Sequence, residues 1–283
     1  MKAVIVYFSI TGNTKKIAEA IGGEFEREGV NTRLVSIRDY DNVNDSKEIL
    51  EADVIGIGSP THFSSLPYNI IPFILENLPD ISGKPVFIFS TSGFSPFAAL
   101  KSLSNLAREK GAEVVGALGA PGYDVIPQIK PLGINVGKPD SGDLHDAERF
   151  AHYLIFKLEN KPKARAWDIS EKIKVSRRWE YVQGVLFAFF RKRTYSPPMH
   201  ISEKCISLGL CAKACPVHRI KMHPKPAFIG ECLMCYQCVY ACPREAIKIN
   251  YPLIPGFVWS CMRWLVQKSR KAEHEYHNPY FYL

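Results

Sequence analysis

A cysteine motif between residues 205 and 243 is repeated once, and one of its cysteines is missing. The complete second copy has the spacing C-x-x-C-x-x-C-x-x-x-C-P and contains Cys232, Cys235, Cys238 and Cys242. The first copy has the same register and keeps Cys205, Cys211 and Cys215. Leu208 stands where the second copy has Cys235. Thiolates at this spacing are typical ligands of iron–sulfur clusters, so the motif predicts one complete cluster site and one that lacks a thiolate.

In paired motifs of this kind, the last cysteine of each copy ligates the cluster of the other copy. We therefore expect a [4Fe-4S] cluster on four thiolates, those of Cys232, Cys235, Cys238 and Cys215. The second cluster would have three thiolates, those of Cys205, Cys211 and Cys242. Leucine cannot bind iron, so at the second cluster we favour a [3Fe-4S] cluster. The alternative is a [4Fe-4S] cluster with water or a small ligand on its open iron.

Zinc and disulfide bonds are the alternative uses of these cysteines. Zinc sites usually combine two pairs of ligands that lie far apart in the sequence, which differs from three closely spaced cysteines followed by a fourth and a proline. Disulfide bonds need an oxidising compartment, and no feature of the sequence indicates one. The eighth cysteine, Cys261, lies outside both copies. We interpret it as a buried structural thiol rather than a ligand.

Charge is distributed unevenly along the chain. Residues 1–160 have 15 Lys and Arg against 20 Asp and Glu, whereas residues 161–283 have 21 against 8. The basic pI of about 9.0 could indicate a nucleic-acid partner. However, the sequence has no nucleic-acid-binding motif, and anionic clusters with a phosphate ligand would offset much of the positive charge. We therefore expect no nucleic-acid partner.

The N-terminal residues and the hydropathy of the chain favour a cytoplasmic protein. Lys2 is followed at once by the apolar run 3–8, which leads into a glycine turn rather than a signal-peptide cleavage site. No stretch reaches the roughly 18 apolar residues that a membrane span needs. A reducing cytoplasm also suits free thiols and clusters.

The apolar run 3–8 is followed by a loop rich in hydroxyl groups and then by apolar residues at helical spacing. This order predicts a strand, a tight loop and a helix, whose first amides would bind a small anion. The loop consists of Ser9, Ile10, Thr11, Gly12, Asn13 and Thr14. It lacks the lysine of nucleoside-triphosphate loops and the three glycines of dinucleotide loops. We therefore expect it to bind a single phosphate monoester.

Strand and helix patterns alternate through the first half of the chain. The predicted strands are 3–8, 32–36, 54–58, 86–90 and 114–118, and the later predicted helices are 70–78, 98–110 and 147–158. This alternation predicts an α/β fold with a doubly wound five-stranded parallel sheet. Ligands of such sheets bind beyond the carboxyl ends of the strands. There we expect loop 9–14 to meet two other loops, which consist of Ser59, Pro60, Thr61, His62 and Phe63, and of Thr91, Ser92, Gly93 and Phe94.

The three loops resemble those of the flavodoxin family, and the resemblance covers residues 1–160. It rests on the Ser-Ile-Thr-Gly-Asn-Thr loop, on Gly-Ser-Pro-Thr after the third strand and on Ser-Thr-Ser-Gly after the fourth. The resemblance implies that the first loop binds the phosphate of FMN and that the other two flank its isoalloxazine ring. Phe63 or His62, and Phe94, would contact that ring, where many flavodoxins have Trp and Tyr. The alternatives are core packing for the two Phe and a polar loop role for His62.

The order of the two halves resembles that of fused flavodoxin–ferredoxin proteins of anaerobes. It implies a flavodoxin-like domain (1–160), a basic linker with a short apolar helix (161–198), a small α+β ferredoxin-like domain (199–252) and an aromatic C-terminal extension (253–283). Those proteins generally have eight cluster cysteines, so Leu208 is a departure. For the apolar stretches 181–190 and 253–266 we favour domain packing over helices on a membrane surface.

A chain that holds a flavin and clusters can convert two-electron chemistry into single-electron steps. We therefore predict an electron-transfer protein that passes electrons between FMN and a partner redox protein through two clusters. The alternative is an FMN-dependent reductase or dehydrogenase that acts on a quinone or NAD(P)H, with residues 120–123 and His62 beside the flavin. Redox sensing is a third interpretation. No catalytic acid, base or nucleophile is evident, and the oligomeric state cannot be read from the sequence.

Overall fold

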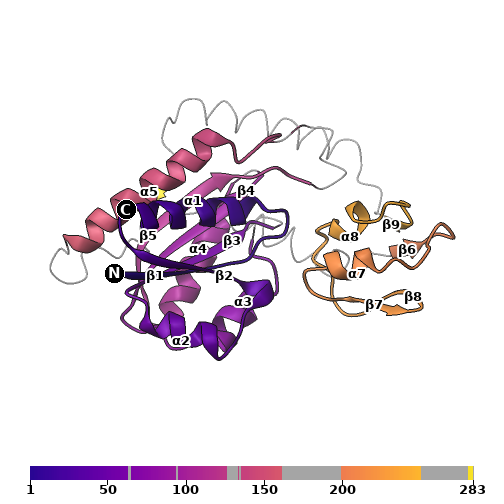
Figure 1. The fold of residues 1–283 in the computed structure, drawn as a ribbon, viewed down its shortest axis with the longest axis horizontal. Helices are drawn as coiled ribbons and strands as arrows, with labels where there is room; N and C mark the ends of the chain where they lie inside the picture. The colour runs from indigo at the N-terminus through magenta and orange to yellow at the C-terminus, as the bar shows by residue number, and fades with distance from the viewer. Residues whose placement is uncertain are drawn as a thin grey trace. The chain divides into compact units, whose positions relative to one another are not determined.

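The computed structural model describes residues 1–62, 65–93, 95–125, 133, 135–160 and 199–249, and the backbone of 280–282. These residues form two compact units (Figure 1). The first contains the described residues up to Asp124, those between 133 and 160, and 280–282, and the second contains Val125 and 199–249. Several predicted features lie outside the described residues, namely Phe63, Phe94, the linker 161–198, Cys261 and nearly all of the extension 253–283.

Strands and helices alternate in the first unit. Its strands are β1 (Lys2–Tyr7), β2 (Asn31–Ser36), β3 (Val54–Pro60), β4 (Pro85–Ser92), β5 (Glu113–Pro121) and β10 (Tyr280–Tyr282). Its helices are α1 (Asn13–Arg27), α2 (Asn44–Glu51), α3 (Ile70–Pro72), α4 (Phe97–Glu109) and α5 (Ser141–Glu159), with the short 3-10 helix η1 (Ile37–Asp39) and the π-helix η2 (Phe73–Asn77). The strand order is β10-β5-β4-β3-β1-β2, and β1 to β5 are mutually parallel. The predicted doubly wound parallel sheet is therefore confirmed.

Three elements differ from the prediction. A sixth strand, β10, pairs antiparallel with β5, with Tyr280 opposite Gly119. Helix α2 was not predicted. The predicted helix 70–78 divides at Pro72, which has no amide hydrogen to donate, and continues as a π-helix in which the Leu78 amide bonds the Phe73 carbonyl.

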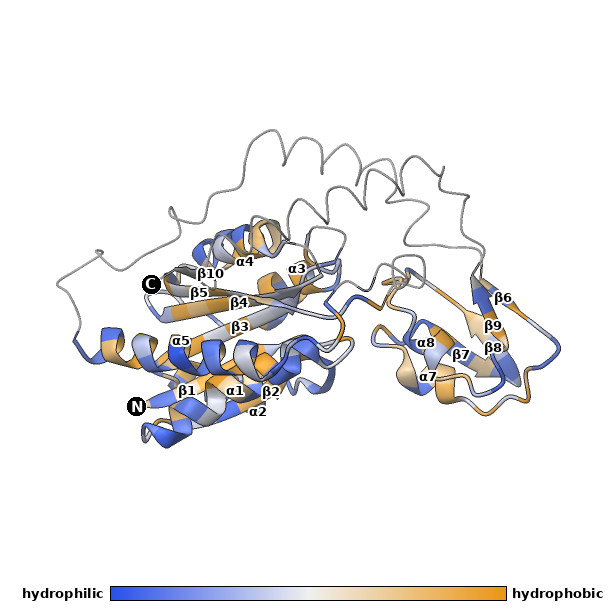
Figure 2. Ribbon diagram, turned by 90° about the horizontal axis from the view of Figure 1, so that it is seen from above, coloured by the Kyte–Doolittle hydropathy of each residue, from blue (hydrophilic) through white to orange (hydrophobic). Residues whose placement is uncertain are grey.

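Aromatic rings fill the core between the sheet and helices α1 and α5. The Phe87 ring of β4 lies 5.6 Å from the Phe25 ring of α1 and 6.0 Å from the Phe150 ring of α5, measured between centroids. Both contacts are edge-to-face, the geometry that aromatic quadrupoles favour. Figure 2 shows α4 on the other side of the sheet from these helices and the hydrophobic residues gathered on the strands.

Two glycines in β3 make room for these rings. Gly56 pairs with Phe87 and Gly58 with Phe89 across the parallel ladder. A Cβ atom added at either glycine would overlap the ring of its partner. Only glycine therefore fits at these two positions of β3 while the rings stay in place.

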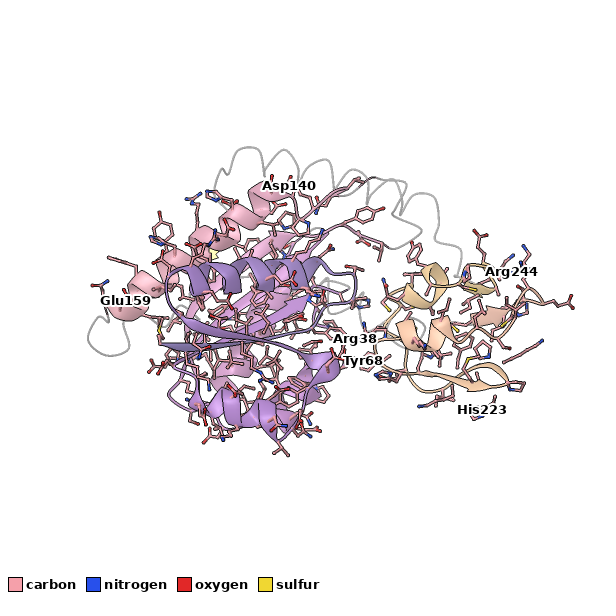
Figure 3. The ribbon with its side chains drawn as sticks, in the orientation of Figure 1. Arg38, Tyr68, Asp140, Glu159, His223 and Arg244 are labelled. Carbon is pink, nitrogen blue, oxygen red and sulfur yellow. The ribbon has the colours of Figure 1, made fainter. Side chains whose placement is uncertain are left out.

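Helix α5 begins at a capping box. The Asp140 carboxylate accepts from the Gly142 and Asp143 amides, and the Asp143 carboxylate accepts from the Asp140 amide. The Lys138 ammonium, 2.8 Å from the Asp140 carboxylate, and the Asp143 amide lower the pKa of Asp140 to about 2. Asp140, whose position is labelled in Figure 3, is therefore charged at neutral pH and caps the helix.

The second unit contains two short copies of one backbone pattern. The first copy is strand β6 (Met199–Ile201), helix α7 (Leu210–Ala214) and strand β7 (Ile220–His223), and the second copy is strand β8 (Lys225–Phe228), helix α8 (Gln237–Tyr240) and strand β9 (Ile247–Ile249). Strands pair between copies, because β6 pairs with β9 and β7 with β8, both antiparallel. In the described part of the chain, no helix has the length and hydropathy needed to cross a membrane.

We predict that Gly58→Ala lowers the free energy of unfolding by about 1–3 kcal/mol, because the new methyl group overpacks the Phe89 ring. Urea unfolding followed by circular dichroism would measure the change. Gly23→Ala is the matched control, since a Cβ atom at this α1 position meets nothing within 4 Å. It should raise the stability by about 0.5–1 kcal/mol through helix propensity. Equal effects of the two substitutions would contradict the packing argument.

Candidate loop site and cysteine cavities

The first candidate site lies at the carboxyl ends of three adjacent strands. Strands β1, β3 and β4 are neighbours in the sheet, and the three predicted loops follow them. The described loop residues are thereby brought to one edge, and they are Ser9–Thr14, Ser59–His62 and Thr91–Gly93. Phe63 and Phe94, for which contact with a flavin ring was predicted, lie outside the described residues, so that expectation stays a prediction.

Hydroxyl groups join these loops. The Thr14 and Thr91 hydroxyls lie 2.8 Å apart in a buried hydrogen bond between the first and third loops. The Thr61 hydroxyl lies 2.9 Å from that of Ser90, and the Thr61 amide donates to the Thr91 carbonyl at 2.7 Å. Ser59 is fully buried, and its hydroxyl donates to the Pro60 carbonyl. The Thr14–Thr91 bond therefore joins the first and third loops, and the bonds of Thr61 join the second loop to β4 and to the third loop.

The first loop has polar groups that are partly bonded within the protein: the Lys15 amide donates to the Ser9 hydroxyl oxygen at 3.2 Å, and the Asn13 side-chain amide donates to the Tyr123 carbonyl at 3.1 Å. Gly12 has φ +90°, which a residue with a side chain adopts only under strain, and it begins helix α1. Thr11 is exposed, and Ser9 and Asn13 are half-buried. The loop precedes the α1 amides at the positive end of a helix, which is a suitable environment for an anion.

A residue that the sequence analysis did not select completes this edge. Asn135 has φ 53°, and its side-chain amide lies within hydrogen-bond distance of three carbonyls: those of Gly93 at 3.1 Å, Ser92 at 3.3 Å and Gly122 at 3.4 Å. It thus joins the loops after β4 and β5. The sequence feature that could have predicted this turn is the position of Asn135 between Gly133 and Gly137, because asparagine tolerates the left-handed conformation of such turns.

The second candidate site consists of two cavities in the second unit, each lined by cysteines. Cavity A contains the thiols of Cys205, Cys211 and Cys242 together with Leu208. Cavity B contains the thiols of Cys215, Cys232, Cys235 and Cys238. Each copy therefore gives its last cysteine to the cavity of the other copy. All seven thiols are free of disulfide bonds.

The strand pairing between copies explains this exchange. Ile201 of β6 pairs with Ile247 of β9, and the Ser202 amide then bonds the Ala246 carbonyl at 2.9 Å. This brings the chain around Cys242 to the chain that leads to Cys205. The β7–β8 hairpin repeats the arrangement, with the Ile229 amide on the Arg219 carbonyl at 2.8 Å.

The backbone around the thiols is also repeated. The Arg219 amide donates to the Cys215 sulfur at 3.4 Å, and the Ala246 amide donates to the Cys242 sulfur at 3.3 Å. Positive φ angles recur 27 residues apart, in pairs that are Ser207 and Met234, Gly209 and Tyr236, and His218 and Glu245. Strained backbone of this kind turns amides toward sulfur atoms, and such bonds stabilise negative charge on thiolates.

Burial opposes ionisation of the thiols. It raises the pKa of Cys235 to about 12 and that of Cys238 to about 12, and the neighbouring sulfurs of cavity B add to both shifts. Burial likewise raises the pKa of Cys211 in cavity A. Closely spaced buried thiolates require a cation among them, so a metal that binds here must displace protons.

Two side chains distinguish the cavities. Leu208 lines cavity A where the second copy has Cys235, and its side chain is 54% exposed. Arg219 lines cavity B where the second copy has Ala246. Arg219 is only 9% exposed, and its Nε and Nη1 atoms are buried without a hydrogen-bond partner. Arg219 was not among the predicted site residues, although the alignment of the two copies places it opposite an alanine.

Comparisons with known proteins show that the first unit is similar to flavodoxins. A family model described as Flavodoxin domain matches residues 4–123. Flavodoxin of Megasphaera elsdenii is 31% identical over 132 residues, which cover 46% of this chain and 93% of that protein. An uncharacterized protein of Methanocaldococcus jannaschii is 32% identical over 159 residues, 55% of this chain and 99% of that protein. A solved archaeal flavodoxin structure is 26% identical with a TM-score of 0.45, covering 56% of this chain and 99% of that one.

One further relative matches only a short part of this chain. The NADH-quinone oxidoreductase subunit I of Pelobacter propionicus is 34% identical over 71 residues. The match covers 19% of this chain and 38% of that protein.

We predict that Asn135→Asp lowers the free energy of unfolding by about 1–3 kcal/mol, because a carboxylate cannot donate to the three carbonyls that the amide contacts. Aspartate has the same shape and also tolerates positive φ. Urea unfolding would measure the loss. Asn105→Asp makes the same charge change at an exposed position of α4 and should alter stability by less than about 0.5 kcal/mol. Similar losses in both variants would contradict the role of Asn135.

Proposed function

Because the chain belongs to the flavodoxin family through its first unit, we propose that it is an electron-transfer iron–sulfur flavoprotein. FMN binds at the loop edge of the sheet, and two iron–sulfur clusters bind in cavities A and B. Electrons pass between FMN and a partner redox protein through the clusters. A flavin exchanges one or two electrons and a cluster exchanges one, so together they couple two-electron to one-electron chemistry.

The loop edge supports FMN as the flavin. The polar groups of the first loop, in Ser9, Thr11 and Asn13, suit a terminal phosphate together with the amides at the start of α1. The loops Ser59–Phe63 and Thr91–Phe94 would flank the ring system. The hydroxyl bonds and Asn135 keep the loops in position, which lowers the entropic cost of binding.

One observation carries the proposal for the clusters: the cysteines form two groups, and each group includes the last cysteine of the other copy. This exchange is the ligand pattern of two-cluster ferredoxins. We assign a [4Fe-4S] cluster to Cys215, Cys232, Cys235 and Cys238, and a second cluster to Cys205, Cys211 and Cys242. The unit 199–252 is then a ferredoxin-like domain.

The donor chemistry fits iron and sulfide. Sulfur atoms are the metal-binding groups that line both cavities, with no carboxylate or imidazole among the lining residues. Soft thiolate sets favour iron–sulfur clusters, although zinc also accepts them. Backbone amides point at the sulfurs of Cys215, Cys232 and Cys242, and the buried guanidinium of Arg219 suits a net anionic group.

Cavity A favours a three-iron cluster. It offers three thiolates, and the Leu208 side chain supplies no ligand atom. A [3Fe-4S] cluster needs three thiolates, whereas a [4Fe-4S] cluster would need water or a small ligand on its fourth iron.

The first test is the cofactor content of the chain purified without oxygen. We expect about one FMN and about seven iron atoms per chain, measured by absorbance and iron assay. Electron paramagnetic resonance should show a three-iron signal before dithionite and a four-iron signal after it. Protein that lacks flavin and iron after reconstitution contradicts the proposal. Rapid oxidation of NAD(P)H or reduction of a quinone by the purified chain alone would favour a reductase instead.

The second test is Leu208→Cys. The new thiol should complete the ligand set of cavity A, so the three-iron signal should disappear and the iron content should rise to about eight atoms per chain. Leu210→Cys is the matched control, because Leu210 lines the same cavity at a position that corresponds to Gln237 rather than to a cysteine. An unchanged spectrum for Leu208→Cys, or the same conversion in both variants, would refute the ligand assignment.

A further inference from the structure

Arg219 is a buried cation that its protein surroundings do not neutralise. Its side chain is 9% exposed and lines cavity B beside the four cysteines. The guanidinium carbon lies 5.7 Å from the centroid of the Phe228 ring. Nε and Nη1 are buried and make no hydrogen bond to the protein.

This arrangement favours an anion close to the guanidinium. A buried guanidinium that makes no ion pair costs several kcal/mol, and a cation–π contact with a phenyl ring returns only about 0.5–2 kcal/mol. Among the described residues, no carboxylate forms an ion pair with Arg219. The groups that can supply negative charge in cavity B are the four cysteine sulfurs and whatever they bind.

The second copy provides an internal comparison. Ala246 occupies the corresponding position beside Cys242, and its amide makes the same bond to sulfur that the Arg219 amide makes. The backbone is therefore equivalent at the two positions, and the difference lies in the side chain. Cavity B has a buried cation at this position, and cavity A has a methyl group.

We propose that the Arg219 guanidinium compensates the charge of the cluster in cavity B and raises its reduction potential above the value that the backbone alone would set. The inference rests on the proposed function. A four-thiolate cluster has a net charge of about −2, which becomes about −3 when it takes one electron from the flavin or the partner protein. A nearby cation stabilises the more negative state more strongly, because the Coulomb energy scales with the charge.

The test is a redox titration of the full chain, loaded with its clusters and monitored by electron paramagnetic resonance. Arg219→Met keeps the length of the side chain and removes its charge. It should lower the equilibrium constant for one-electron reduction of the four-cysteine cluster about tenfold, which is about 59 mV for a one-electron couple. Arg219→Lys should restore part of the loss. The cluster on Cys205, Cys211 and Cys242 should shift much less.

Arg244→Met is the matched control, since Arg244 lines cavity A but is exposed (Figure 3). Solvent screening should make its effect on either cluster much smaller. Equal shifts for Arg219→Met and Arg244→Met, or an unshifted potential in Arg219→Met, would overturn the inference and leave the proposed function intact. A wild-type chain without clusters would instead contradict the proposed function.

Assembly of the cluster gives a second readout. If Arg219→Met binds no iron in cavity B, the iron content of Arg219→Lys distinguishes a requirement for positive charge from a requirement for the shape of arginine. Normal iron content in the lysine variant supports a requirement for positive charge. Loss of iron in both variants overturns the inference, because it indicates that the arginine acts through its shape and its packing on Phe228.

Discussion

The pairing of strands between the two copies is the constraint on which the second unit depends. Strand β6 belongs to the first copy and pairs with β9 of the second, while β7 and β8 join the copies in a hairpin. Because each pairing ends just before or after a cysteine run, it sets which sulfurs lie together. The cysteine spacing places the sulfurs of one copy around each cavity. The strand pairing then brings the last cysteine of the other copy to the same cavity.

The first unit is governed by a different constraint, the filling of space on one side of a parallel sheet. Phe87 lies between the rings of α1 and α5, and the glycines of β3 leave the space that the rings need. Strands β1, β3 and β4 are thereby held as neighbours, and their loops meet at one edge. Hydrogen bonds of hydroxyl groups then connect the loops. The packing of the rings in the core therefore helps to determine the geometry of the loops at the carboxyl ends of the strands.

Much of this could be predicted from sequence because it depends on short-range pattern. Apolar runs between glycine turns marked the five parallel strands. The cysteine spacing predicted two sets of cluster ligands, and both the ligand roles and iron binding stay predictions. Strand β10 could not be predicted, because three residues far along the chain carry no periodicity and pair through backbone atoms alone. Asn135 and Arg219 were not predicted as site residues. Asn135 matters because the fold brings its amide close to distant carbonyls, and Arg219 because the fold buries its guanidinium without a hydrogen-bond partner at two of its nitrogens.

The exchange of cysteines makes neither repeat self-sufficient. A peptide with only the first copy would hold Cys205 and Cys211 without Cys242, and Cys215 without its three companions. A single repeat could enclose such cavities only by pairing with a second molecule of itself. With both copies in one chain, closure of the cavities does not depend on concentration, and the two copies can differ at Leu208 and Arg219, which a symmetric pair of identical chains could not do.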